Sequence, residues 1–167
     1  LAELRLFLDP IDILLIDTAA GISSNVMYFN TAAQQILVVV SPEPTSMTDA
    51  YALMKVMSLR YSKKKFKLLV NLAASSREAY EIFRQLTLVS SRFLDITIDY
   101  LGHVLVDDKL TKSVKRQRLL CDTYPESVGS KCFFTLAEAI CKLPLPNSLN
   151  GNNTYFWDKI LENNFEQ

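Results

Sequence analysis

Asp17 and Gly21 are the residues of this 167-residue chain whose types and spacing best suit chemistry. They follow residues 11–16, a largely apolar run that predicts a parallel strand buried on both faces. Where such a strand leaves a sheet, a carboxylate and free backbone N–H groups emerge together. Asp17 could then hold a water of hydrated Mg²⁺, and Gly21, without a Cβ, could bring its N–H to a terminal phosphate. The alternative is that Asp17 only caps the next helix.

Three more strands are predicted at residues 36–40, 66–72 and 96–105, and a helical pattern follows each of them. Pro42 and Pro44 end the first of these runs because proline cannot continue a strand ladder. Strands that alternate with helices are joined by right-handed crossovers. The expected fold class is therefore α/β, a mainly parallel sheet with helices on both faces. Ligands of such sheets bind at the carboxyl ends of the strands.

Polar residues predict where the helices begin. Ser46 with Asp49, and Ser75 with Glu78, have the spacing of a capping box. The other helix starts are expected near residue 22, at Asp107 with Asp108, and at Ser130.

The composition argues against several classes of protein. Lys plus Arg and Asp plus Glu balance at 18 each, so no global field draws the chain to nucleic acid or to a membrane surface. Cys121, Cys132 and Cys141 are odd in number and form no Cys-x-x-Cys pair, which argues against a disulfide framework and a zinc site.

His103 is the only histidine and lies inside a predicted strand, so a Ser-His-Asp triad is not expected. We interpret His103 as a core or strand-end residue with satisfied hydrogen bonds.

Residues 16–22, 38–53 and 69–71 together resemble the MinD/ParA class of deviant P-loop ATPases. The middle run is especially similar to the flagellar-number regulators of the FlhG family, also called FleN or YlxH. The resemblance implies ATP and Mg²⁺ as cofactors and a homodimer switched by nucleotide. It also implies a cytoplasmic protein, peripheral at the inner face of the cell membrane, whose partners are a flagellar GTPase or flagellar switch or regulator proteins.

The resemblance assigns roles to single residues. Asp17 matches the aspartate that holds Mg²⁺ through water, and Gly21 matches the switch glycine facing the γ-phosphate, so these two are the expected catalytic residues. Asn71 matches the asparagine that recognises the adenine edge. Asp107 falls in the segment that lines the base, where Leu105 replaces the usual proline. The expected cofactor-binding residues are Asp17, Thr18, Gly21, Pro42, Glu43, Asn71 and Asp107.

One part of such an ATPase is absent from these residues. None of the four glycines lies in a Gly-rich loop with Lys and Ser or Thr that could wrap the phosphates. We expect the chain to be the carboxyl-terminal part of a domain that continues upstream for about 100 residues. By itself this part should hydrolyse no ATP, and its uncovered sheet should drive dimerisation or poor solubility. The expected divisions are residues 1–143 (the ATPase part), 144–153 (a linker) and 154–167 (a short amphipathic helix).

The alternative function is a non-enzymatic scaffold of the same fold that has lost nucleotide chemistry.

Two surfaces also have competing interpretations. A basic cluster after the strands is interpreted as a solvated helix face and not as a nucleic-acid site; it contains Lys112, Lys115, Arg116 and Arg118.

The terminal segment lies where MinD-like proteins carry a membrane-targeting helix. Its acidic Asp158, Glu162 and Glu166 outweigh Lys159, which favours packing on protein over binding to anionic lipid. The apolar residues that would touch a membrane are Phe156, Trp157, Ile160 and Leu161.

Overall fold

The structure is a computed structural model that describes residues 12–144. The linker after residue 144 and the amphipathic helix at 154–167 therefore lie outside the described residues. The chain divides into two compact units, Leu1–Ile36 with Leu145–Gln167, and Leu37–Pro144. No helix within the described part has the length and apolar composition needed to cross a bilayer.

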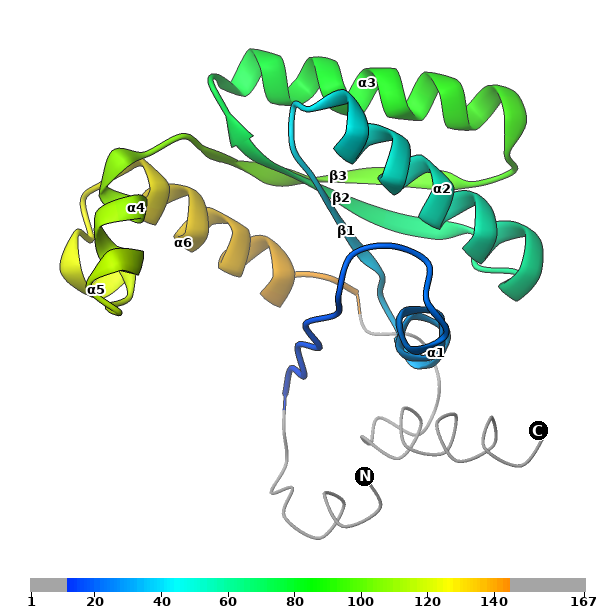
Figure 1. The fold of residues 1–167 in the computed structure, drawn as a ribbon, viewed down its shortest axis with the longest axis horizontal. Coiled ribbons are helices and arrows are strands. Elements are labelled where there is room, and N and C mark those ends of the chain that lie inside the picture. The colour runs from blue at the N-terminus through cyan, green and yellow to red at the C-terminus, as the bar shows by residue number, and fades with distance from the viewer. Residues whose placement is uncertain (1–11, 145–167) are drawn as a thin grey trace, which may run out of the picture. The chain divides into compact units, whose positions relative to one another are not determined.

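Three parallel strands form the sheet of the second unit (Figure 1). They are β1 (Leu37–Val40), β2 (Lys65–Ala73) and β3 (Thr97–Leu105), hydrogen-bonded in that order. Two crossover helices, α2 (Pro44–Tyr61) and α3 (Ser76–Phe93), connect them. The sequence-based prediction of a parallel α/β sheet is confirmed, and the strand boundaries differ by one residue.

One face of the sheet packs against α2 and α3. Phe66, Leu68 and Val70 alternate along β2 and are at most 1% exposed, as expected for side chains on one face of a strand. Tyr100 pairs with Leu68 in the ladder, and its ring lies 5.2 Å from the ring of Phe83 of α3, centroid to centroid. The core therefore lies between the sheet and these helices.

The opposite face is covered at β3 by α6 (Val128–Cys141), and Figure 1 shows α3 and α6 on opposite sides of this strand. At this point the register shifts by one residue, so that Leu69 pairs with Gly102. Gly102 has a φ of 152°, and a Cβ there would lie 2.7 Å from Leu136 Cδ2 of α6. Only glycine allows this backbone and this approach of the helix together.

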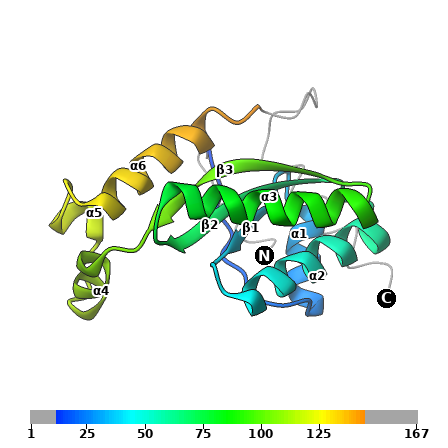
Figure 2. The ribbon, with the colours of Figure 1, turned by 90° about the horizontal axis from the view of Figure 1, so that it is seen from above.

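Two short helices, α4 (Asp108–Lys115) and α5 (Leu120–Thr123), lie beyond the carboxyl end of β3 in both views (Figures 1 and 2). The end of α4 is a Schellman motif, because Arg118 N–H donates to Ser113 O at 3.1 Å and Gln117 N–H to Val114 O at 3.0 Å. Gln117 occupies the left-handed position of this motif with a φ of 52°. Glycine is the usual residue there, so the turn carries some backbone strain.

Replacing Gln117 by glycine should raise the free energy of unfolding by about 0.5–1 kcal/mol, because the left-handed strain disappears while the unfolded chain gains some freedom. Urea unfolding followed by circular dichroism would measure the change. Gln85→Gly, at an exposed position inside α3, is the matched control and should destabilise by about 1 kcal/mol. Equal losses from both substitutions would contradict the strain at Gln117.

The predicted helix starts are partly right. Ser75 caps α3, since its Oγ accepts from Glu78 N–H at 3.1 Å, as predicted. The capping box at Ser46 is wrong: α2 begins at Pro44, and Ser46 Oγ accepts from Ser41 N–H at 3.0 Å instead. Proline at the first helical position fixes the start, so the N-cap is Glu43, three residues earlier than predicted.

The last helix also begins earlier than predicted. Its N-cap is Ser127, whose Oγ accepts from Ser130 N–H at 3.2 Å, so Ser130 lies inside α6. Helix α5 is not among the predicted helices, and Asp107 caps α4 as expected.

The predicted strand at residues 11–16 is wrong for the part that the structure describes. Residues 13–19 have no regular secondary structure, and Leu15 is 74% exposed. A buried parallel strand needs a neighbouring strand for its ladder and helices over both faces. The described sheet contains β1, β2 and β3 only. The helix predicted next is present as α1 (Ser24–Ala32).

Candidate functional site

The carboxyl ends of the three strands meet at one edge of the sheet. Val40 pairs with Val70, and Ala73 pairs with Leu105. Because the strands are parallel, the residues that follow each strand emerge at the same edge. Four of the expected cofactor-binding residues lie there, at the end of β2 or in the segments after β1 and β3: Pro42, Glu43, Asn71 and Asp107.

Asn71 lies in the last part of β2 and is half-buried. Its Oδ1 accepts from Leu72 N–H at 3.0 Å, and within residues 12–144 its Nδ2 has no hydrogen-bond partner. Leu72 has a φ of 57°, in the left-handed region that non-glycine residues rarely adopt, and its side chain is exposed. The N–H of this strained residue fixes Oδ1 of Asn71, which leaves the Nδ2 amide group as a free donor at the carboxyl edge of the sheet.

Asp107 joins two helix starts through its carboxylate. Oδ1 accepts from Lys109 N–H at 2.8 Å, which caps α4, and Oδ2 accepts from Gly129 N–H at 2.9 Å in the first turn of α6. The hydrogen bond from Gly129 N–H lowers the pKa of Asp107 most, and the one from Lys109 N–H lowers it further, because both stabilise the charged form. Asp107 is therefore a carboxylate at neutral pH that fixes α4 against α6.

An open pocket of about 510 Å³ lies beside Asp107. Small-molecule sites in proteins usually fall between about 300 and 1,000 Å³, so a base or nucleoside would fit by volume. Pro42, Glu43 and Asn71 do not line it. Its lining residues are Val106, Asp107, Asp108, Lys109, Lys112, Ser127 and Val128.

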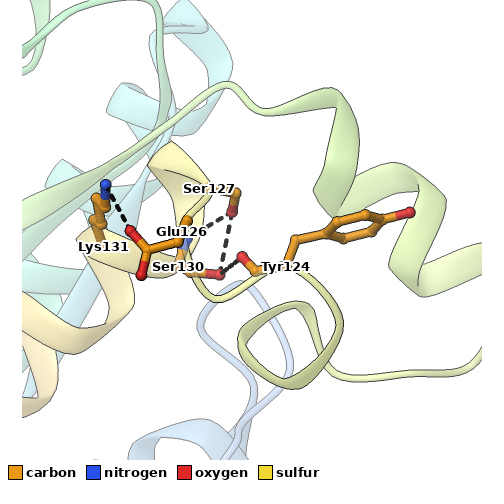
Figure 3. Close-up of polar contacts among 5 residues, drawn as sticks. All are labelled: Tyr124, Glu126, Ser127, Ser130 and Lys131. Carbon is orange, nitrogen blue, oxygen red and sulfur yellow. Dashed lines mark hydrogen bonds and ion pairs between the residues drawn. The ribbon is translucent and has the colours of Figure 1, made fainter.

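A chain of hydrogen bonds through Ser127, which lines this pocket, supports the start of α6 (Figure 3). Ser127 O–H donates to Ser130 Oγ at 3.1 Å, and Ser130 O–H donates to Tyr124 O at 2.7 Å. Ser130 is fully buried, so each of these bonds satisfies a polar group that water cannot reach. At the surface, Lys131 pairs with Glu126 at 3.1 Å. The arrangement keeps Gly129 N–H directed at Asp107.

The remaining expected site residues, Asp17, Thr18 and Gly21, belong to the first unit. All three are exposed, and Gly21 has a φ of 95°. No group of three His, Cys, Asp or Glu side chains that could hold a metal occurs in residues 12–144. A single carboxylate acting through water would still suit Mg²⁺, which keeps several of its waters when bound.

His103 has the satisfied environment predicted from the sequence. Its Nδ1 lies 2.9 Å from Tyr100 Oη and its Nε2 lies 2.9 Å from Ser76 Oγ. Burial raises the pKa of Tyr100, so the phenol stays protonated and can serve the imidazole as a hydrogen-bond partner.

Known proteins are similar to this chain over most of its length, although no family model matches it. The antiactivator FleN of Pseudomonas aeruginosa is 38% identical over 154 residues, which cover 92% of this chain and 55% of FleN. The flagellum site-determining protein YlxH of Helicobacter pylori is 27% identical over 131 residues, which cover 78% of this chain and 44% of YlxH. The chain is FlhG/MinD-like.

A solved structure agrees with the fold of this FlhG/MinD-like chain. The MinD cell division protein of Aquifex aeolicus has a TM-score of 0.50 at 18% identity, over 70% of this chain and 47% of that one. At such identity the match shows the fold alone, a parallel α/β fold like that of MinD. The chain spans about half the length of the curated relatives it matches.

The sequence does not predict the hydrogen bond between Asp107 and Gly129. This bond joins residues 22 positions apart, and no local pattern encodes it. The structure explains the glycine at position 129, since a Cβ there would lie 3.2 Å from Asp107 Oδ2 and 2.8 Å from Leu120 Cδ2.

Proposed function

We propose that this chain belongs to an ATP-binding switch protein of the MinD/ParA class that controls flagellar number or placement. The similarity to FleN over 92% of the chain carries this proposal. The names of FleN and YlxH point to regulation and to the site of the flagellum. The collection of Pro42, Glu43, Asn71 and Asp107 at one sheet edge supports the nucleotide part, because ligands of parallel sheets bind there.

The base end of a nucleotide fits the residues present. Asn71 has a free amide donor, which suits a ring nitrogen of adenine, while its oxygen is held by Leu72 N–H. The pocket beside Asp107 has room for a nucleoside, and Lys109 and Lys112 give it two cations. These residues would bind and orient the base and exclude water from one of its faces.

The phosphate end is assigned to Asp17, Thr18 and Gly21. Gly21, which has a positive φ and no neighbour within 4 Å of a Cβ position, would present its N–H to the terminal phosphate. Asp17 would hold Mg²⁺ through water, and the ion would neutralise charge on the phosphates. The 167 residues contain no Gly-rich loop, so hydrolysis by this chain alone is not proposed.

As a switch, ATP would lie between two subunits and favour a homodimer, and slow hydrolysis would reset it. The proposed partners are a flagellar GTPase or a flagellar switch or regulator protein, in the cytoplasm. Contact with the inner face of the membrane would involve Phe156, Trp157, Ile160 and Leu161, all outside the described residues.

A scaffold without nucleotide turnover is the second candidate function. The observation in its favour is that both carboxylate oxygens of Asp107 accept backbone hydrogen bonds, so this residue already has a structural role. Leu105 in place of proline points the same way. Such a protein would keep the fold and bind partners without ATP.

Substituting Asn71 by alanine should weaken ATP binding to the full-length protein about tenfold, the usual effect of losing one hydrogen bond to a ligand. Isothermal titration calorimetry with Mg·ATP would measure the dissociation constant. Asn25→Ala, at an exposed position of α1, is the matched control and should leave the affinity unchanged.

The possible results separate the two functions. Weaker binding by Asn71→Ala alone supports the switch. Equal affinities of the wild type and Asn71→Ala would contradict the role of this residue. No binding of ATP by the full-length wild type would reject the switch and favour the scaffold.

A further inference from the structure

Strand β2 contains a β-bulge at Asn71 and Leu72. Its register against β3 shifts between Val70 and Ala73, so that two residues of β2 lie opposite the single Val104 of β3. Bulges bend a strand, change the direction of its side chains and are over-represented beside active sites. This one lies at the carboxyl end of β2, the edge of the sheet where parallel strands bind their ligands.

The bulge places the side chains of Asn71 and Leu72 together, outside the core. The buried residues of β2 alternate up to Val70, so regular alternation would bury residue 72 next. Ala73 is buried instead, at 0% exposed, whereas Leu72 is 46% exposed and Asn71 is half-buried. The extra residue therefore shifts the buried row by one position and leaves an amide and an aliphatic side chain next to each other.

The backbone of Leu72 is held in a strained conformation. Its φ of 57° is left-handed, which is rare for a residue with a large side chain. Its N–H donates to Asn71 Oδ1 at 3.0 Å, so the same residue orients the amide of its neighbour. Backbone strain of this kind occurs mostly at ligand sites, and such sites combine apolar walls with a few oriented polar groups.

The bulge is also connected to the pocket beside Asp107. Val106 lines that pocket and donates its N–H to Ala73 O at 3.0 Å, directly after the bulge. Val106 is 58% exposed. Exposed aliphatic side chains thus occur near the end of β2 and directly after β3, at one edge of the sheet.

We propose that Leu72 is the apolar wall against which the adenine ring of ATP packs, while Asn71 Nδ2 donates to a nitrogen at the edge of that ring. The bulge holds the two groups side by side, so Leu72 determines specificity for a flat aromatic base. This inference rests on the nucleotide-binding function proposed above.

Isothermal titration calorimetry of the full-length protein, with Mg·ATP and with Mg·tripolyphosphate, tests the role of Leu72. Leu72→Asn removes the apolar group, yet asparagine is similar in size and tolerates a left-handed backbone. ATP binding should weaken about three- to tenfold, as expected when a base no longer covers the exposed half of a leucine. The affinity for tripolyphosphate, which has no base, should stay the same.

Leu72→Met tests whether an apolar side chain is sufficient at this position. It keeps the volume and the apolar character, so ATP should bind to it about as tightly as to the wild type. This contrast with Leu72→Asn is decisive by itself where tripolyphosphate binds too weakly to measure. Leu88→Asn is the matched control, because Leu88 is 69% exposed on α3 and should leave both affinities unchanged. Circular dichroism would show that each variant is folded.

Four results would overturn the proposal. Equal ATP affinities of the wild type and Leu72→Asn would reject the apolar wall and leave the nucleotide switch intact. Equal losses for ATP and tripolyphosphate would mean that Leu72 only supports the strand. A loss in Leu72→Met as large as that in Leu72→Asn would exclude apolar contact as the cause. No ATP binding by the wild type would reject the switch and the wall together.

Discussion

Gly102→Ala is expected to lower the free energy of unfolding by about 2–4 kcal/mol, the largest effect of the substitutions considered. The new Cβ would lie 2.7 Å from Leu136 Cδ2, well inside contact distance. The backbone φ of 152° is also one that alanine rarely adopts. Both effects act where α6 packs on β3, so the helix must shift or the strand must distort. Urea unfolding followed by circular dichroism would measure the loss.

The Leu136→Ala background separates the two causes. There the overlap is removed, so adding Gly102→Ala should cost only the backbone strain, about 1–2 kcal/mol. An equal loss in both backgrounds would show that the contact with Leu136 contributes nothing. No loss in either background would contradict the requirement for glycine at this position.

Asp107→Ala should lower the free energy of unfolding by about 2–3 kcal/mol. The substitution removes the N-cap of α4 and leaves Gly129 N–H without its acceptor at the start of α6. Asp108→Ala is the matched control, because Asp108 is an exposed neighbour in the first turn of α4 whose effect on the helix dipole is worth less than about 1 kcal/mol. Similar losses of stability in Asp107→Ala and Asp108→Ala would show that the Asp107 carboxylate does not stabilise the packing of α4 against α6.

The pH dependence gives an independent check on Asp107. Its pKa is lowered in the folded protein, so its stabilisation is complete above the unfolded pKa of about 4 and is lost as pH falls through the folded value. The stability difference between the wild type and Asp107→Ala should therefore be constant from about pH 6 to 8 and shrink below about pH 4. A difference that grows with acidity would have the wrong sign.

The sheet could be predicted from the sequence because its signals are local. The β-branched run at β1 and the apolar alternation at β2 identify strands by themselves. The rule that parallel strands end at one edge also predicts that Asn71 and Asp107 lie at the same edge of the sheet. The cap at Ser75 is also predictable from local sequence, because a capping box spans only four residues.

The errors arise where structure depends on distant partners. The run at 11–16 is apolar enough for a strand, but apolarity says nothing of which strand would share its hydrogen bonds. Ser46 has the right spacing for a cap, yet Pro44 sets the helix start because its φ is already helical. The pocket beside Asp107 depends on α6, which approaches only through the glycines at 102 and 129. No local pattern could reveal that approach.

The parallel order of the strands also has a consequence for biosynthesis. Leu37 pairs with Lys67, 30 residues later, and Lys67 pairs with Asp99, 32 residues later. At a translation rate of about 5–20 residues per second, β1 waits about 2–6 s for its first neighbour. Its four residues, Leu37–Val40, are all apolar, so during that interval the nascent chain carries an apolar segment without its ladder partner.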